Sequence, residues 1–281
     1  MGRFKFDWSA DGVRSQGDLS LEDLTFRGPG LAVTQTAGIN GDIRLTSLMP
    51  PTTDGVQRLR IDRIDLDALQ LVEGAVDFAL DGDDVLRIEN ASFPWFGGRI
   101  GVYDTEVAMK DGSATAVLRA DEANLDEILE FVDVAGLSGE GVLDGVLPLV
   151  VEDGRARIDG GALSAVGPGV VRYVGAAAVA AASASADAAL AFDGLQEFRY
   201  ASLSATVAGP LDGDLKIGLE FEGEGAVRLN DPRLREATVL PMIYRVSVAG
   251  PLLQLVQQSK RTKNLILKLE GAVSSDEDGG P

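Results

Sequence analysis

Apolar and polar residues alternate along most of the chain. In residues 214–222, Leu215, Ile217, Leu219 and Phe221 are separated by polar residues or glycine. A period of two places successive side chains on opposite faces of an extended strand, so the pattern predicts strands with one apolar face. The same period occurs in residues 3–8, 76–80, 203–207 and 264–270.

Asp-Gly pairs separate many of these segments. Both residues tolerate the positive φ values that tight hairpin turns require, so each pair predicts a turn. A repeated order of strand and turn predicts an antiparallel meander. The pairs begin at Asp11, Asp54, Asp81, Asp111, Asp144, Asp153, Asp193 and Asp212.

Two segments have a helical pattern instead. Residues 124–136 carry apolar residues at helical spacing, and Asn124 with Glu127 has the spacing of a capping box. Residues 175–192 are rich in alanine, which has the highest helix propensity. A short third helix is predicted near residues 252–258.

Two other segments look irregular. Residues 47–57 contain two prolines and an Asp-Gly pair, and they are predicted to form a loop. Residues 273–281 are predicted to be a disordered acidic tail.

The composition excludes several kinds of chemistry. The chain contains no cysteine and no histidine, which rules out a disulfide scaffold, a Cys/His zinc site and a Ser-His-Asp triad. The net charge of −19 disfavours nucleic acid and anionic headgroups as partners. The chain contains no run of 18 apolar residues, so no segment is expected to span a bilayer as a helix. We expect no enzymatic activity, no cofactor and no metal.

Clusters of charged residues and glycines have ordinary structural explanations. Carboxylates gather at residues 81–84 and 121–130, where a solvated turn and a polar helix face explain them better than a catalytic pair or a calcium loop. Gly167-Pro168-Gly169 precedes a strand-like segment and not a helix, so a turn explains it better than a phosphate loop. The basic residues Lys260, Arg261 and Lys263 could contact lipid headgroups or an acidic partner, but protection of the last strand from edge-to-edge aggregation explains them better.

The apolar strand faces leave two interpretations open at this point. They can fill the core of an ordinary β-sandwich or barrel. They can also line an unfilled groove, which the low aromatic content of 6% and the 34 glycines favour weakly.

The order of several segments resembles the C-terminal region of the YdbH-like family. This region also carries the older label "dicarboxylate transport" domain. That family is grouped with the AsmA-type, bridge-like lipid transfer proteins of Gram-negative envelopes. The resemblance is specific over residues 120–272 and limited to β-rich style over residues 1–119. Its segments are LSGEGVLDGVLPL (137–149), RIDGGAL (157–163), GPGVVRY (167–173), LQEFRYASLSA (195–205), GPLDGDL (209–215) and GPLL (250–253).

The resemblance implies a mostly β fold: an elongated, antiparallel, curved sheet shaped as a half-pipe, with two or three short helices. It implies three parts, residues 1–119, 120–272 and 273–281. It also implies phospholipid transport across the periplasm by a protein that an N-terminal helix, absent from this chain, anchors in the inner membrane. A small outer-membrane lipoprotein is expected to dock at the C-terminal end by strand addition.

Candidate site residues follow from the alternating segments. We expect eight apolar residues to line the groove and residues 264–269 to form the edge strand that a partner pairs with. The groove residues are Leu203, Val207, Leu215, Ile217, Leu219, Phe221, Val246 and Val248; the edge residues are Asn264, Leu265, Ile266, Leu267, Lys268 and Leu269.

Two alternatives belong to other functional classes. The first is a structural or adhesive β-domain with a filled core and no lipid path. The second is a carrier of small acids, which would require arginines or lysines converging in a pocket. The 25 basic residues show no such cluster within an apolar segment.

Overall fold

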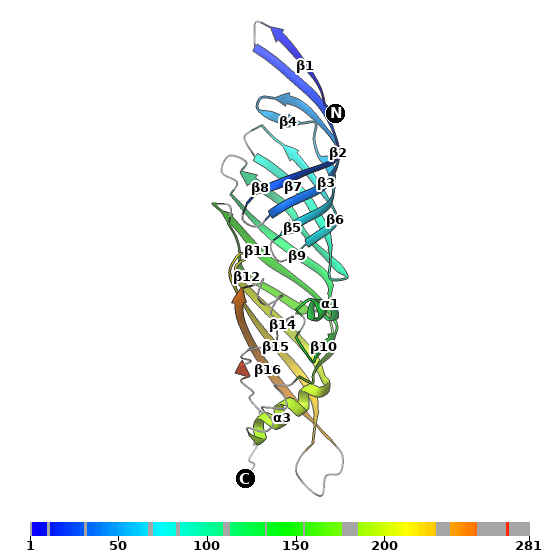
Figure 1. Cartoon of the computed structure of the whole chain (residues 1–281), viewed down its shortest axis with the longest axis vertical. Helices are drawn as coiled ribbons and strands as arrows, with labels where there is room; N and C mark the ends of the chain where they lie inside the picture. The colour runs from blue at the N-terminus through cyan, green and yellow to red at the C-terminus, as the bar shows by residue number, and fades with distance from the viewer. Residues whose placement is uncertain are drawn as a thin grey trace, which may run out of the picture.

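A single open antiparallel sheet forms an elongated molecule, with its strands stacked along the long axis (Figure 1). The computed structural model describes residues 2–9, 12–30, 33–66, 70–82, 85–108, 113–132, 134–153, 155–175, 185–228, 237–251 and 268–269. Within these residues the sheet has 17 strands and does not close into a barrel. The predicted fold class is therefore confirmed.

The N-terminal part is a meander of long hairpins in which each strand pairs with the next. Short β4 is the exception, because among the strands it pairs with β3, apart from an isolated bridge from Thr52 to Asp81, and β3 continues to β5. The strands are β1 (Gly2–Ser9), β2 (Gly12–Gly30), β3 (Val33–Leu48), β4 (Pro51–Thr53), β5 (Gln57–Leu66), β6 (Gln70–Leu80), β7 (Val85–Trp95), β8 (Gly98–Ala108) and β9 (Ala114–Asn124).

The C-terminal part continues the same sheet after one helix. Its elements are α1 (Leu125–Val132), β10 (Leu137–Glu140), β11 (Val142–Glu152), β12 (Arg155–Ala165), β13 (Gly169–Tyr173), α3 (Ala186–Gly194), the 3₁₀ turn η1 (Leu195–Glu197), β14 (Phe198–Pro210), β15 (Asp214–Val227), β16 (Thr238–Pro251) and β17 (Lys268–Leu269). Strand β9 pairs with β11, so the sheet runs without a break past residue 120.

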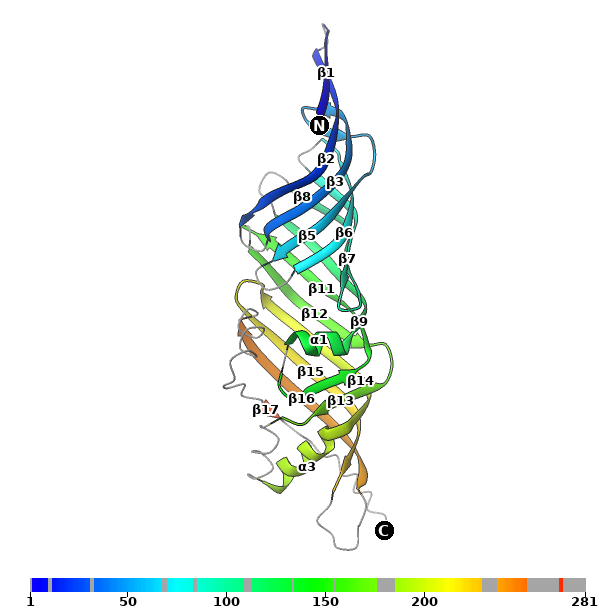
Figure 2. The ribbon, with the colours of Figure 1, turned by 45° about the vertical axis from the view of Figure 1, so that its right-hand side comes forward.

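Strands β10 and β13 pair with each other beside the main sheet. Gly141 separates β10 from β11, and residues 166–168 separate β12 from β13. Strand β13 keeps its pairing with the first residues of β14, while β12 pairs with the rest of β14. The hairpin of β11 and β12 is therefore bent, and α1 lies against β10 across the lower strands (Figure 2).

The two faces of the sheet differ in polarity. On one face, called here the polar face, arginines pair with carboxylates on neighbouring strands: Arg44 with Asp18, Arg58 with Asp77, and Arg245 with Glu220. Exposed ion pairs contribute at most about 1 kcal/mol each to the free energy of unfolding. The pairs therefore make this face polar but add little to the stability of the protein. The other face carries the apolar side chains and is called the apolar face.

Bulges bend several strands. Asp23, Glu122 and Gly160 have positive φ values of 50°, 56° and 78°, each where the register with a neighbouring strand shifts. A bulge bends its strand and increases the local twist, which curves a long sheet. Side chains of the next strand satisfy the displaced backbone: Asn40 Oδ1 accepts from the N–H of Asp23 at 2.8 Å, and Asp144 Oδ1 accepts from the N–H of Glu122 at 2.7 Å.

The helix predictions are partly confirmed. Helix α1 begins one residue after Asn124, whose side-chain amide donates to the Glu127 carboxylate at 3.4 Å. In the alanine-rich segment, α3 begins at Ala186, where the Ser185 hydroxyl accepts from the N–H of Ala188. Residues 176–184, 252–260 and 271–281 lie outside the described part of the chain, so the third helix and the acidic tail stay predictions.

Two turn predictions are wrong, and the loop prediction for residues 47–57 is wrong in part, since only residues 49–50 and 54–56 lie outside strands. Asp144-Gly145 lies within β11, where the Asp144 carboxylate caps the bulge in β9, and Asp193-Gly194 ends α3. Pro51–Thr53, predicted as loop, forms β4 because its backbone pairs with β3. Asp54 and Asp81 directly follow β4 and β6, and Asp212 lies in the turn between β14 and β15, as their Asp-Gly pairs predict.

Candidate functional site

A continuous row of apolar residues crosses the apolar face. The row has one residue on each of twelve strands: β2, β3, β5 to β9, β11, β12 and β14 to β16. Cross-strand register pairs join each residue to the next. The exception is the step from Gly74 to Phe93, where the Phe93 ring packs over the glycine. The residues of this apolar row are Leu24, Ile39, Ile61, Gly74, Phe93, Ile100, Ala120, Gly145, Leu163, Ala205, Leu219 and Val246. At a strand spacing of about 4.8 Å, the row is roughly 50 Å long.

Side chains beside the apolar row extend the apolar surface. A second register row joins Leu59, Val76, Ala91, Val102, Leu118 and Leu147 across β5 to β9 and β11. Most residues of the apolar row are buried, whereas Leu59, Val76 and Leu118 are half-buried. A ligand on this face would therefore contact the second row first.

The predicted groove residues lie together on the apolar face. Leu219 and Val246 belong to the apolar row, and Val207, Ile217 and Val248 form a neighbouring register row. Val207, Ile217, Leu219 and Val246 are half-buried. Only the backbone register of Val248 is described.

The remaining three predicted groove residues are more enclosed. Leu203 and Phe221 are cross-strand neighbours that are buried in an aromatic cluster, and Leu215 is buried near the start of β15. All three are therefore less accessible to a ligand than the other predicted residues whose burial is described.

The aromatic cluster closes the C-terminal end of the apolar face. The rings of Phe198, Phe221 and Tyr244 contact one another with centroids 4.9 to 5.4 Å apart. Phe192 of α3 and Leu125 of α1 pack against the same cluster. Because Phe198 and Tyr244 are at most 2% exposed, this end is filled by the protein's own side chains.

Two tyrosine hydroxyls attach covering elements to this cluster. Tyr244 donates to the carbonyl of Ala191 in α3 at 2.6 Å, and Tyr200 donates to the carbonyl of Glu140 in β10 at 3.0 Å. Burial raises the pKa of both phenols, most strongly that of Tyr244. The hydroxyls therefore stay protonated and hold α3 and β10 over the sheet.

The N-terminal end of the apolar face is exposed. Phe4, Phe6, Leu24 and Phe26 have 43 to 57% of their surface accessible, although equivalent positions further along the sheet are buried. The two ends therefore differ: one is open and the other is filled.

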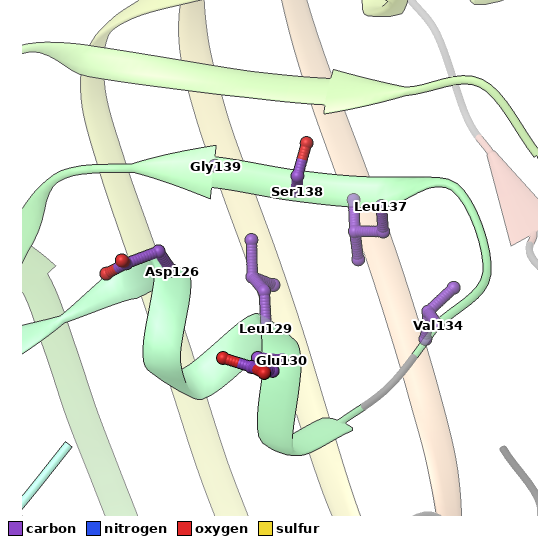
Figure 3. Close-up of a pocket in the computed structure, with 7 residues that line it drawn as sticks. All are labelled: Asp126, Leu129, Glu130, Val134, Leu137, Ser138 and Gly139. Carbon is purple, nitrogen blue, oxygen red and sulfur yellow. The ribbon is translucent and has the colours of Figure 1, made fainter. Parts of the chain in front are cut away.

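A small pocket lies between α1 and β10 (Figure 3). Its volume is about 260 Å³, and Leu129, Val134 and Leu137 point into it from the helix, the connecting loop and the strand. The carboxylates of Asp126 and Glu130 lie at its side. The pocket is separate from the apolar row and too small to hold a two-chain lipid.

The predicted edge segment lies only partly in the described chain. Lys268 and Leu269 form β17, which pairs with Ser247 and Val246 of β16. Residues 264–267 lie outside the described residues. The described residues of the segment thus border β16, and pairing with a partner stays a prediction.

Sequence reasoning missed the N-terminal half of the apolar face. Residues such as Ile39, Ile61 and Leu118 belong to it, but bulges at Asp23 and Gly38 change the face that successive residues occupy. A signal existed in the two apolar residues at 21 and 24, whose spacing of three marks the bulge in β2.

An open, elongated sheet with one unbroken apolar face and one ion-paired face defines a class of proteins that can carry an extended apolar ligand. The family model described as "YdbH-like: Intermembrane phospholipid transport protein YdbH" matches residues 2–272. The chain therefore belongs to the YdbH-like family of intermembrane phospholipid transport proteins. The match includes residues 2–119, where the sequence segments alone showed only a similar β-rich character.

Other comparisons add no relative. Neither the curated proteins nor the solved structures contain a match to this chain. In the described residues, no helix is long and apolar enough to cross a bilayer. Intermembrane transport places the family in the cell envelope.

Proposed function

We propose that the chain carries phospholipid between two membranes by holding the acyl chains against its apolar face while the headgroups stay in water. The continuous apolar row is the observation that carries this proposal, because no charged or polar side chain interrupts it from β2 to β16. Membership of a phospholipid transport family supports the choice of ligand.

Hydrocarbon transfer energies explain why such a face is needed. Exposing hydrocarbon to water costs about 0.8 kcal/mol for each CH₂ group, so two sixteen-carbon chains cost roughly 25 kcal/mol. A lipid in contact with an apolar surface avoids much of this cost at every step. The apolar face, with Val207, Ile217, Leu219 and Val246 half-buried near its C-terminal end, then acts as the groove.

A carboxylate in the groove tests the proposal. Leu219→Asp places a charge on the apolar row, and an acyl chain passing it must displace the water around that charge at a cost of several kcal/mol. We expect transfer of fluorescent phospholipid between donor and acceptor vesicles to fall by at least about tenfold. Circular dichroism checks that the fold survives.

Thr206→Asp is the matched control for this variant. Thr206 is exposed on the polar face, one residue from Ala205, which pairs with Leu219. It adds the same charge without entering the groove, so transfer should stay near the wild-type rate. Normal transfer by a folded Leu219→Asp variant would contradict the assignment, and a wild-type chain that carries no lipid would favour the structural or adhesive domain.

We further propose that the protein works in the periplasm, anchored in the inner membrane through a segment outside this chain. A small outer-membrane lipoprotein would dock at residues 264–269 by strand addition. The position of β17 beside β16 supports an edge role for this segment. Free backbone groups on an edge strand offer hydrogen bonds to an added strand.

Deleting residues 264–269 tests the docking proposal. We expect cross-linking to the lipoprotein in cells to disappear, because the added strand loses its backbone partner. The unfolding temperature should change little, since the segment lies at the border of the sheet. Retained cross-linking would show that the lipoprotein docks elsewhere.

A further inference from the structure

Trp95 is a polar exception on the apolar face. It lies two residues after Phe93 of the apolar row and packs against the same hydrophobic cluster. Among the described residues, its indole Nε1 has no hydrogen-bond partner, and less than 1 Å² of that atom is exposed. A buried donor without an acceptor costs about 1–3 kcal/mol, so this N–H would gain from any acceptor that reached it.

The position of Trp95 suggests which acceptor could reach the indole N–H. Trp95 ends β7 and pairs with Gly98 at the tip of the β7–β8 hairpin, where strands stop and the apolar face meets its border. The Phe96 ring contacts it at 4.6 Å, and the Phe96 carbonyl accepts from the N–H of Asn124 at 2.7 Å where β9 ends and α1 begins. Trp95 itself is half-buried while Pro94 and Gly97 beside it are exposed, so the residue lies where the apolar face meets solvent.

A phospholipid has the same transition along its length. Its acyl chains are apolar, its headgroup is hydrated, and the ester carbonyls lie between them as hydrogen-bond acceptors. Tryptophan is enriched at membrane interfaces because its ring is apolar while its N–H needs an acceptor. A lipid with its chains along the apolar row would place its ester carbonyls near the border.

We propose that the Trp95 indole N–H donates a hydrogen bond to an ester carbonyl of the carried lipid, which positions the lipid and favours ester-linked over ether-linked chains. This inference rests on the proposed function, since it assumes lipid on the apolar face. Less than 1 Å² of Nε1 is exposed, so the groups around it must move when the lipid enters. The ligand class is thereby narrowed to ester-linked phospholipid.

A choice between two lipids tests the contact. The chain is incubated with vesicles holding equal amounts of a diester and a diether phosphatidylcholine with the same hydrocarbon chains, then reisolated, and its bound lipids are quantified by mass spectrometry. We expect wild type to retain the diester over the diether by about tenfold, the effect of one hydrogen bond. Trp95→Phe keeps an aromatic ring without the donor, so its ratio should fall to about one.

Trp8→Phe is the matched control, because Trp8 and Trp95 are the two tryptophans of the chain. This variant should keep the diester preference. It also leaves a single indole N–H for NMR, with Trp95 itself unchanged. Its proton signal should move downfield when the diester lipid binds and stay in place with the diether lipid.

Each outcome separates the contact from transport. Equal binding of both lipids by wild type would overturn the contact while transport stands. A Trp95→Phe variant that loses both lipids equally would assign Trp95 to packing and also overturn it. Recovery of neither lipid with wild type would contradict the proposed function and the contact together.

Discussion

Buried tyrosines at the closed end show how single polar groups act in an apolar setting. The Tyr244 hydroxyl lies inside the aromatic cluster and bonds to a carbonyl of α3. Tyr200 makes the equivalent bond to β10. Each hydroxyl finds a hydrogen-bond acceptor in an element that covers the cluster, and the bond holds that element in place. The arrangement of the cluster therefore depends on hydrogen bonds as well as on apolar packing.

The stability of the protein should fall at alkaline pH because of Tyr244. Burial raises the pKa of Tyr244 above its ordinary value, so the folded state keeps this proton when the unfolded chain has lost it. The unfolded state then binds fewer protons, and the free energy of unfolding decreases once the pH exceeds about 10. The stabilising contribution is complete below that pH.

Urea unfolding at several pH values checks this expectation. Tyr244→Phe should be less stable at pH 7 by roughly 1 kcal/mol, through the lost hydrogen bond, but should decline less steeply once the pH exceeds about 10. Tyr103→Phe changes an exposed tyrosine and serves as the control. Parallel curves for wild type and Tyr244→Phe would show that Tyr244 does not cause the alkaline loss.

At the scale of elements, the close approach of strands depends on where glycines stand. Gly74 lies on β6 under the Phe93 ring of β7, and a Cβ at position 74 would come within 2.0 Å of that ring. The apolar row crosses from β6 to β7 through this contact. A glycine is therefore required there for space.

Gly74→Ala should destabilise the protein by about 1–3 kcal/mol, because the ring must move or the strands must separate. Gly167→Ala is a matched control, since a Cβ at position 167 would meet nothing within 4 Å. Thermal or denaturant unfolding measures both. Equal stability of the two variants would mean that the Phe93 ring adapts at no cost.

The sequence predicted regular elements better than their deviations. Strict alternation in residues 214–222 predicted β15 and the face of Leu219 correctly, because that strand has no bulge where it pairs with β16. The alternating pattern did not predict the faces correctly near Asp23 and Glu122. An extra residue in the strand there shifts the apolar residues between odd and even sequence positions. The aromatic cluster was not predicted, since Phe198, Phe221 and Tyr244 meet only through the pairing of three strands and the packing of α3.

For the whole molecule, the apolar row makes the proposed path serial. A lipid travelling from β2 to β16 must pass each strand in turn, so a charge on the apolar face of any one strand lies beside its path. The strength of one block should therefore not depend on where it lies. This property distinguishes a conduit from a carrier with one binding site.

Leu59→Asp should reduce vesicle-to-vesicle transfer as strongly as Leu219→Asp, by at least about tenfold, although it lies on β5. Combining both should add little once either dominates the resistance. Arg60→Asp puts the same charge on an exposed neighbouring position of β5 and should leave transfer nearly unchanged. Normal transfer by Leu59→Asp would confine the lipid site to the C-terminal part.

The aromatic cluster at the closed end has a consequence for the geometry of delivery. Because Phe198 and Tyr244 fill the space under α3, which lies near the C-terminal tip of the molecule (Figure 1), a lipid on the proposed path would not leave along the long axis. It has to turn and depart sideways, over a rim formed by strand ends. The receiving bilayer would then lie beside the protein at its point of release, and not in front of its tip.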